Sequence, residues 1–492
     1  MAFASGVYAQ DFGFDDSWGT ASAPALSVKI SGEIAASLSG YVQDFSSGEE
    51  IKAVSLGDIV SGALIFSASA ANVNAVIGLN LSAANIGDPA YTPLILDEAY
   101  LRAYFGPVNI EAGLRKLSWG KADSLGPLDV INPLDYTDLR NMSDLQAIKI
   151  ARPLVHATWN MDGFSKLEAV FIPSFTGHRF AQEGRWMPAQ YSNIYSSISE
   201  NIETGIYERL PPQYLPVFDS MYPVIYPQIA ASFDSAALFP DTGGLDYFQT
   251  GLRFTTTIGP ADIGVQYFYG NLFRPDFTGV NVDDFLDDLV LRNLPFILGF
   301  DPSNPDFSNL YYGNPNLIPP PIKYNRYHQI GIDYAQVLFD FNIRAEFAVH
   351  LTEDMKGDDG TVRNPFIGWS LGFDRNLFWG INANVQCTET IRLLDDKVGN
   401  DPLLDCEADT NALSTRMTIR LSKKFLMDEL ESRATVIWDI ENSDCYIIPA
   451  LVWTAGDLST ELSAGIFTGN ESGELGQYWK NSFVKLGLKY TF

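Results

Sequence analysis

The last thirteen residues of the chain, 480–492, alternate between apolar and polar side chains. Apolar residues occupy one face of this segment: Val484, Leu486, Leu488, Tyr490 and Phe492. A period of two is typical of a β-strand with one apolar and one polar face. The same period recurs in residues 29–36, 73–82, 341–351, 381–386 and 416–421. The chain is therefore predicted to be all-β.

The composition of the chain indicates whether these strands belong to a soluble protein or to one that crosses a membrane. Charged residues make up 19% of the chain, below the roughly 25% of soluble proteins. No run approaches the about 18 apolar residues that a membrane helix needs, and amphipathic helical stretches are rare. The remaining way to cross a bilayer is a closed barrel, because every backbone N–H and C=O must be paired.

The terminal segment resembles the closing strand of bacterial outer-membrane β-barrels. In that family a terminal aromatic is part of the signal read by the barrel-assembly machinery. The resemblance implies that Leu488, Tyr490 and Phe492 carry this signal, with outer-membrane lipid as the surroundings. The alternative is an ordinary edge strand that ends the protein.

The pattern predicts about eighteen strands, an even number as single-chain bacterial barrels require. They cover residues 25–42, 57–70, 72–83, 95–106, 108–120, 146–161, 164–175, 246–259, 261–273, 324–338, 340–353, 365–378, 380–393, 413–427, 430–442, 445–456, 459–469 and 480–492. Every second connection is tight, at Ala71, Gly106-Pro107, Asp162-Gly163, Gly259-Pro260, Phe339, Trp379, Asp428 and Gly456-Asp457. Short periplasmic turns and long extracellular loops are the two rims of a transmembrane antiparallel β-barrel. Residues 25–492 are thus predicted to form one such barrel in a Gram-negative outer membrane.

Residues 1–24 are predicted to be a signal-peptide remnant and a periplasmic segment. Val7-Tyr8-Ala9 looks like the end of a secretory signal, although the basic region and the full apolar stretch are missing. A plain disordered N-terminus is the alternative. Export fits a content of three cysteines, and Cys406 and Cys445 are candidates for a disulfide in an oxidising space. Cys387 lies on a predicted strand, so the sequence leaves the pairing open.

The net charge of −28 argues against nucleic acid as a partner. The acids cluster outside the predicted strands, at Asp283, Asp284, Asp287, Asp288, Asp395, Asp396, Asp401, Asp405, Glu407 and Asp409. Solvated loops are one interpretation, and a divalent-cation site is the other. Since none of these runs has EF-hand spacing, no metal ligand is assigned.

Two connections, about 176–245 and 274–323, are too long for plain loops. Both are rich in proline and aromatic residues, whereas disordered segments have few aromatics, and residues 282–294 fit a short helix. We expect these loops to fold over or into the barrel mouth as a lid or constriction. The alternatives are a cap that packs on itself, or an outward aromatic face that binds a surface partner.

Residues 113–140 resemble a named pattern, G-R-Q-x-x-x-W-G-x-x-D…D-x-x-N-P-x-D. It belongs to a proteobacterial barrel family of unknown function, placed near the alginate-export-type large porins. The Arg-Gln pair is replaced here by Leu114 and Arg115. The matching positions are Gly113, Trp119, Gly120, Asp123, Asp129, Asn132, Pro133 and Asp135. We expect Trp119 where a strand leaves the bilayer, and turns at Asn132-Pro133 and Asp135 that order an outer loop near the pore entrance.

Nothing in the sequence points to catalysis or to a cofactor. Gly368-Trp369-Ser370-Leu371-Gly372 matches a nucleophile elbow, but that motif needs a strand-to-helix turn and here lies inside an alternating strand. Four histidines have no metal-ligand spacing, and nucleotide-binding and zinc-protease motifs are absent.

Alternation also assigns charges to the lumen. A basic patch is predicted at Arg344, Arg392, Arg416, Arg420 and Arg433, among other lumen charges that include Arg102, Glu111, Arg115, Arg253, Glu346 and Asp374. Fixed charge of one sign in a channel concentrates counter-ions, so the patch favours passage of small anionic solutes. Acids on neighbouring strands that neutralise the arginines are the alternative. A loop-plugged barrel that takes up hydrophobic molecules, and a non-conducting adhesin or anchoring barrel, are the other functions that the sequence leaves open.

Overall fold

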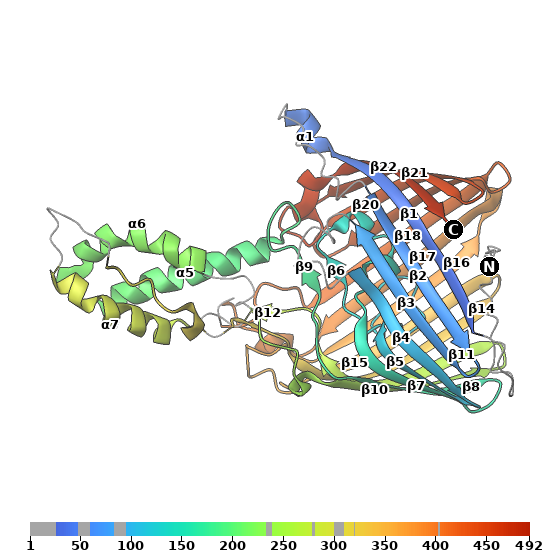
Figure 1. Ribbon diagram of the computed structural model, residues 1–492, viewed down its shortest axis with the longest axis horizontal. Helices are drawn as coiled ribbons and strands as arrows, with labels where there is room; N and C mark the ends of the chain where they lie inside the picture. Colours follow the sequence, from blue (N-terminus) through green and yellow to red (C-terminus); the bar gives the residue numbers. More distant parts are fainter. Residues whose placement is uncertain are drawn as a thin grey trace, which may run out of the picture.

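The computed structural model describes residues 26–47, 60–82, 95–232, 239–277, 281–299, 309–318, 320–401 and 404–492 (Figure 1). The expected signal remnant and N-terminal segment, 1–24, lie outside them. An antiparallel sheet of 18 strands dominates the chain. Its strands are β1 (Ser27–Tyr41), β2 (Val60–Ala70), β3 (Val73–Ser82), β4 (Leu96–Phe105), β5 (Val108–Arg115), β7 (Arg152–Asn160), β8 (Ser165–Ile172), β10 (Gln249–Ile258), β11 (Ala261–Asn271), β14 (Arg326–Leu338), β15 (Phe341–Thr352), β16 (Phe366–Asn376), β17 (Ile381–Arg392), β18 (Leu413–Phe425), β19 (Leu430–Asp439), β20 (Asp444–Ala455), β21 (Leu458–Thr468) and β22 (Phe483–Thr491).

The sheet closes on itself because the first and last strands pair. Ile34 on β1 lies opposite Tyr490 on β22. The backbones of Gly32 and Phe492 exchange two hydrogen bonds of 2.9 Å, each residue donating once. With this pairing the ladder continues around the whole wall, which leaves the sheet without an edge. The predicted closed barrel and its strand number are confirmed.

The two faces of the wall differ as the alternation predicts. The five apolar residues of the C-terminal segment, 484–492, have exposed fractions between 41% and 52% on the outer surface. On β15, Phe347 faces outward while its neighbours Glu346 and Ala348 are buried inside. An apolar exterior around a closed antiparallel barrel is the architecture of bacterial outer-membrane proteins. The protein is an integral outer-membrane β-barrel.

Among the described residues, none of the helices combines the length and the hydropathy that a membrane span requires.

Short and long connections alternate around the barrel as predicted, so one end is a short-turn rim and the other a loop rim. The strand bounds agree closely with the sequence except beside one connection. The strand predicted over 108–120 ends at Arg115 as β5, and the one predicted over 146–161 begins only at Arg152 as β7. The residues between them, which the period-two pattern partly assigned to strands, leave the wall and lie inside the barrel.

Shorter elements lie in the connections. Two two-stranded ladders pair β6 (Asp135–Tyr136) with β9 (Arg179–Phe180) and β12 (Asp276–Phe277) with β13 (Ile322–Lys323). The α-helices are α1 (Val42–Ser47), α4 (Leu145–Ile148), α5 (Ala189–Arg209), α6 (Leu215–Ser232) and α7 (Asp283–Gly299). Single 3-10 turns are η2 (Leu139–Asn141), η3 (Pro212–Tyr214), η5 (Leu245–Tyr247), η6 (Pro315–Leu317), η7 (Phe378–Gly380), η8 (Asp395–Lys397) and η9 (Gly476–Asn481).

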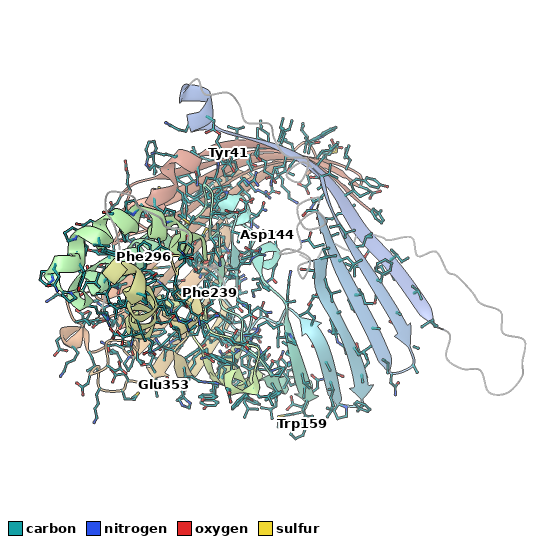
Figure 2. All side chains as sticks on the ribbon, turned by 60° about the vertical axis from the view of Figure 1, so that its left-hand side comes forward. Tyr41, Asp144, Trp159, Phe239, Phe296 and Glu353 are labelled. Carbon is teal, nitrogen blue, oxygen red and sulfur yellow. The ribbon has the colours of Figure 1, made fainter. Side chains whose placement is uncertain are left out.

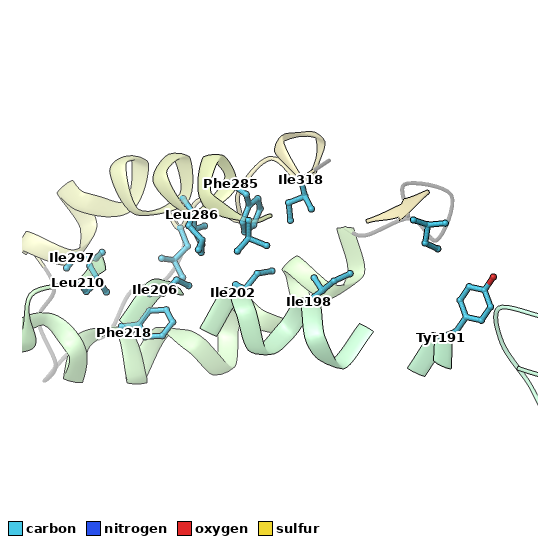
Figure 3. Packing of buried hydrophobic residues seen from close by; sticks show 14 residues of the cluster. Tyr191, Ile198, Ile202, Ile206, Leu210, Phe218, Phe285, Leu286, Ile297 and Ile318 are labelled. Atoms are coloured by element: carbon cyan, nitrogen blue, oxygen red, sulfur yellow. The ribbon is translucent and has the colours of Figure 1, made fainter. Parts of the chain in front are cut away.

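Three helices, α5, α6 and α7, extend away from the loop rim as a helical arm (Figure 1). Their shared core places Ile198, Ile202 and Ile206 of α5 against Phe285 and Leu286 of α7 (Figure 3). The 3.6-residue period of these isoleucines gives α5 one apolar stripe, which α7 covers. The helix expected over 282–294 is thus present as α7. The distal parts of both long connections pack on each other, as the cap alternative describes, while their bases enter the barrel mouth.

Candidate functional site

The connection between β5 and β7, residues 116–151, runs through the lumen and is called the inner loop below. One of its anchors is the carboxylate of Glu346 on β15. This carboxylate accepts backbone N–H bonds from Lys121, Ala122 (2.7 Å) and Leu128 (3.3 Å). A carboxylate bound by several N–H donors is a strong attachment, so Glu346 fixes this part of the loop against the wall.

Glutamines on three other strands extend the attachment. Gln386 on β17 accepts from the backbone N–H groups of residues 123 and 124 at 2.8 and 2.9 Å, and donates to the Leu125 carbonyl at 3.1 Å. Gln329 on β14 donates to the Pro127 carbonyl, and Gln266 on β11 donates to the Leu128 carbonyl. Amides suit this task because they satisfy a loop backbone that has no ladder of its own.

The far part of the inner loop reaches other strands of the barrel. Tyr446 on β20 donates its hydroxyl to the Leu139 carbonyl at 3.1 Å. Arg140 donates to the Ser39 hydroxyl on β1 at 3.0 Å, and Lys485 on β22 donates to the Asn141 side chain at 3.2 Å. Figure 2 shows Asp144 of this loop within the outline of the barrel. The loop therefore crosses from the wall of β11–β17 to the wall formed by β20, β22 and β1.

The family-like motif forms this crossing. Asn132 closes its neck, because its side chain accepts from Leu117 N–H at 2.7 Å and donates to the carbonyls of Arg115 and Ile150. Asp129 is ion-paired with Lys149 at 2.6 Å. Gly113 and Gly120 adopt positive φ, Pro133 accepts from Ile150 N–H, and Asp135 begins β6. The sequence had assigned Asn132, Pro133 and Asp135 to turns that order an outer loop near the pore entrance, whereas they lie in the inner loop itself, inside the barrel.

Trp119 corrects a second expectation. It does not lie at the bilayer boundary, because β5 ends four residues earlier and the indole packs inside the barrel. Its exposed fraction is 3%, and it meets Phe268 of β11 edge-on at a ring separation of 6.4 Å. Trp159, by contrast, projects from the barrel exterior (Figure 2). Alternation could not separate the two because the period-two pattern continues past Arg115 and places Trp119 inside the strand predicted over 108–120.

Small residues in the wall make room for the inner loop. A β-carbon at Gly368 on β16 would lie 2.8 Å from Cβ of Pro127, whereas one at Gly372, on the same inward face, would meet no atom closer than 3.5 Å. The glycines that imitated a nucleophile elbow therefore lie in a strand, and one of them provides clearance beneath the loop.

We expect Gly368→Ala to destabilise the barrel by about 1–3 kcal/mol, because an added methyl in a filled space forces side chains apart. The matched control is Gly372→Ala, which we expect to change stability by less than about 0.5 kcal/mol. Urea unfolding of the two variants in lipid vesicles measures the difference. Equal stabilities would mean that the inner loop does not press on β16.

All five arginines of the predicted basic patch face the lumen, but four of them are ion-paired. Arg344 pairs with Asp123 of the inner loop and with Asp374, and Arg392 pairs with Asp395 at 2.5 Å. Arg416 pairs with Glu474 at 2.7 Å, and Arg433 pairs with Glu461 at 2.5 Å. The neutralised lumen that the sequence offered as an alternative thus describes these four sites.

Two lumen arginines differ from the rest. Arg420 on β18 and Arg274, which follows β11, are exposed to water and form no ion pair with any described residue. The pKa of Glu474 is lowered mainly by the charge of Arg416, and that of His178 mainly by burial; the charge of Arg274 lowers both further. Sequence reasoning missed Arg274 because it lies in a loop without periodicity, and the same holds for Glu474.

Three other predicted lumen charges, Arg102, Glu111 and Arg115, belong to one network along β4–β8. Glu111 is bonded to Arg102 and Arg115 and to His156 at 3.0 Å. His156 also contacts Glu168 at 3.3 Å. Further round, Arg253 pairs with Asp333 at 2.7 Å. Each of these arginines thus lies against a carboxylate of the same wall.

A cavity of about 180 Å³ lies beside the inner loop, and a cluster of aromatic rings borders it. The His178 ring lies 5.3 Å from the Tyr136 ring and 5.2 Å from the Phe273 ring, centroid to centroid. Nδ1 of His178 accepts from Leu134 N–H at 2.9 Å, which places the ring proton on Nε2. The cavity is lined by Leu125, Gly126, Asp129, Asn132, Leu134, Tyr136, His178 and Phe273.

Burial, reinforced by the charge of Arg274, lowers the pKa of His178 to about 3. An unfolded chain takes up this proton near pH 6.5, so the stability that His178 contributes is complete above pH 6.5 and falls as pH drops toward 3. We expect the free energy of unfolding to fall by about 3 kcal/mol less for His178→Gln, which keeps an acceptor for Leu134, than for the parent between pH 7 and pH 4. Urea unfolding at both pH values tests this. Parallel losses in the two proteins would contradict it.

Two further expectations concern the loops. Cys387, Cys406 and Cys445 are all free, so the candidate disulfide between Cys406 and Cys445 is wrong for this structure. The second expectation concerns the acidic cluster at 283–288. Two of its acids, Asp283 and Asp287 of α7, pair with Arg209 of α5. Within the described residues, no three His, Cys, Asp or Glu side chains gather as metal ligands would.

Comparison with known proteins finds similarity in backbone structure but not in sequence. No family model matches the chain, so the resemblance to a family near the alginate-export-type porins stays a prediction. No curated protein matches by sequence. Among solved structures, the outer membrane protein opdK from Pseudomonas aeruginosa is 9% identical, with a TM-score of 0.44 over 94% of this chain and 98% of that one. A BenF-like porin from Pseudomonas fluorescens Pf-5 is 8% identical, with a TM-score of 0.44 over 95% and 98%. The outer membrane channel DcaP of Acinetobacter baumannii is 8% identical, with a TM-score of 0.39 over 95% and 97%. Identities this low say nothing of what the present chain transports.

Proposed function

We propose that the protein is an outer-membrane channel for small solutes, narrowed by its inner loop and selective for anions. The observation that carries the proposal is the inner loop itself. A barrel of 16–18 strands leaves an aqueous channel unless something fills it, and here a folded segment is fixed across the lumen by hydrogen bonds to opposite walls. Such an element sets a size limit while the wall keeps its shape.

The preference for anions rests on Arg274 and Arg420. The other patch arginines are matched by nearby acids, so their fields largely cancel. Charges that face water inside a low-dielectric wall act over longer distances than surface charges. Neither cation forms an ion pair with a described residue, although Glu474 partly offsets the charge of Arg274. Together they favour anions in the lumen even though the whole chain carries −28.

Recording from the purified protein in planar bilayers tests both parts. We expect discrete current steps. In a KCl gradient we expect a reversal potential whose sign shows that chloride permeates more readily than potassium. The opposite sign would contradict the proposed anion selectivity. Silence from folded protein would contradict the channel and favour a second candidate, a plugged barrel, which is supported by the same crossing of the lumen.

A further inference from the structure

The cavity beside His178 has polar groups with unused hydrogen-bonding capacity. Oδ1 of Asp129 is buried and accepts no hydrogen bond, although Oδ2 is paired with Lys149. Nε2–H of His178 remains a donor, because Nδ1 is used by Leu134. Asn132, in contrast, spends its carbonyl and its amide on the neck of the loop. The cavity therefore offers one strong acceptor and one donor.

The electrostatic character of the cavity is neutral. The ion pair with Lys149 compensates Asp129, and His178 is uncharged at neutral pH because burial lowers its pKa to about 3. The charge of Arg274 acts on His178, but Arg274 does not line the cavity and offers no direct pairing to a ligand there. An anionic ligand would meet the buried Asp129 carboxylate oxygen with no cation of the lining beside it, which disfavours its binding. A neutral ligand avoids this penalty.

The volume and the aromatic lining narrow the choice. At about 180 Å³ the cavity is many times the roughly 10–15 Å³ that one water molecule needs on the same measure. Tyr136 and Phe273 flank His178 and give the site apolar ring surface. A suitable ligand donates a hydrogen bond to Asp129, accepts one from His178 and places C–H groups against the aromatic rings. A molecule with several hydroxyl groups on a carbon skeleton meets these three requirements.

We propose that this cavity is a binding subsite for neutral polyhydroxylated solutes, of the size of a monosaccharide, within the lumen. The inference deepens the proposed function, on which it rests, because it names a solute class that the channel would hold. Binding at equilibrium does not require conduction, so the two can fail separately. The field of Arg274 and Arg420 governs small ions, whereas the subsite selects by hydrogen bonding.

Calorimetric titration of the folded protein in detergent with glucose, and with glucuronate as its anionic counterpart, tests the subsite. We expect glucose to bind more tightly than glucuronate. Leu125→Phe fills the cavity while its backbone carbonyl keeps its bonds to β17, and should weaken glucose binding at least about tenfold.

The matched control is Leu462→Phe on the exterior face of β21, which makes the same change away from the lumen and should leave binding unaltered. Absence of glucose binding would overturn the subsite and leave the cavity to water. Tighter binding of glucuronate, or glucose binding that Leu125→Phe does not alter, would overturn it as well. If glucose binds as expected but no current is recorded, only the proposed channel fails.

Discussion

Excision of the inner loop is expected to raise the single-channel conductance several-fold. Arg115 and Arg152, which flank the loop, are directly opposite each other in the ladder between β5 and β7. A hairpin turn of two to five residues can therefore replace residues 117–150 without changing the register. Closure of the barrel depends on pairing between strands, so the wall should persist while the obstruction is lost. Conductance in planar bilayers, at equal salt, measures the gain.

A control for this excision is removal of the helical arm, in which linkers replace α5, α6 and α7. The arm extends away from the barrel (Figure 1), so its loss should leave conductance nearly unchanged. Unchanged conductance after excision of the inner loop would place the narrowest point elsewhere in the lumen. A large gain from removal of the arm alone would show that its base, and not the inner loop, limits the current.

The strands could be predicted because their pattern is local. Phe347 faces lipid and is apolar, whereas Glu346 faces inward and is polar. The side of the wall that a residue faces decides its polarity, whatever its distant contacts are. The parity of tight turns added a second independent signal. The inner loop could not be predicted in this way, since its contacts join residues more than two hundred positions apart, such as Ala122 and Glu346. A family-like motif marked the right residues, but turn chemistry assigned them the wrong place.

The lumen charges were predicted in position but not in pairing. Alternation placed Arg416 inside correctly, because one strand decides its side. Its partner Glu474 lies in the irregular connection before β22, where no period gives direction. The same limit applies to Arg274, which follows the last residue of β11. Contacts between loops and strands could therefore be found only from the structure. Gly368, which lies beneath Pro127, was visible in the sequence, but there it formed part of a pattern that matched a catalytic motif.

Breaking the ion pair between Arg416 and Glu474 from either side should shift ion selectivity in opposite directions. The pair has an N–O distance of 2.7 Å, and Arg416 lowers the pKa of Glu474, so both are charged at neutral pH. The Glu474 side chain is 56% exposed and meets Arg416 on the lumen face of β18, so its charge is in contact with the water of the lumen. Glu474→Gln leaves Arg416 and Arg274 without compensation and should favour anions. Arg416→Gln leaves Glu474 and should favour cations.

Each single change should alter the anion-to-cation permeability ratio by roughly threefold, the Boltzmann factor for about one kT of local potential. The double variant, Arg416→Gln with Glu474→Gln, should return close to the parent because the net charge is restored. Arg292→Gln removes an arginine paired with Asp288 at 2.6 Å on the arm and serves as the matched control. Reversal potentials in a KCl gradient distinguish these cases. If both single variants shift in the same direction, a change of shape rather than of charge is responsible, and the pair does not set selectivity.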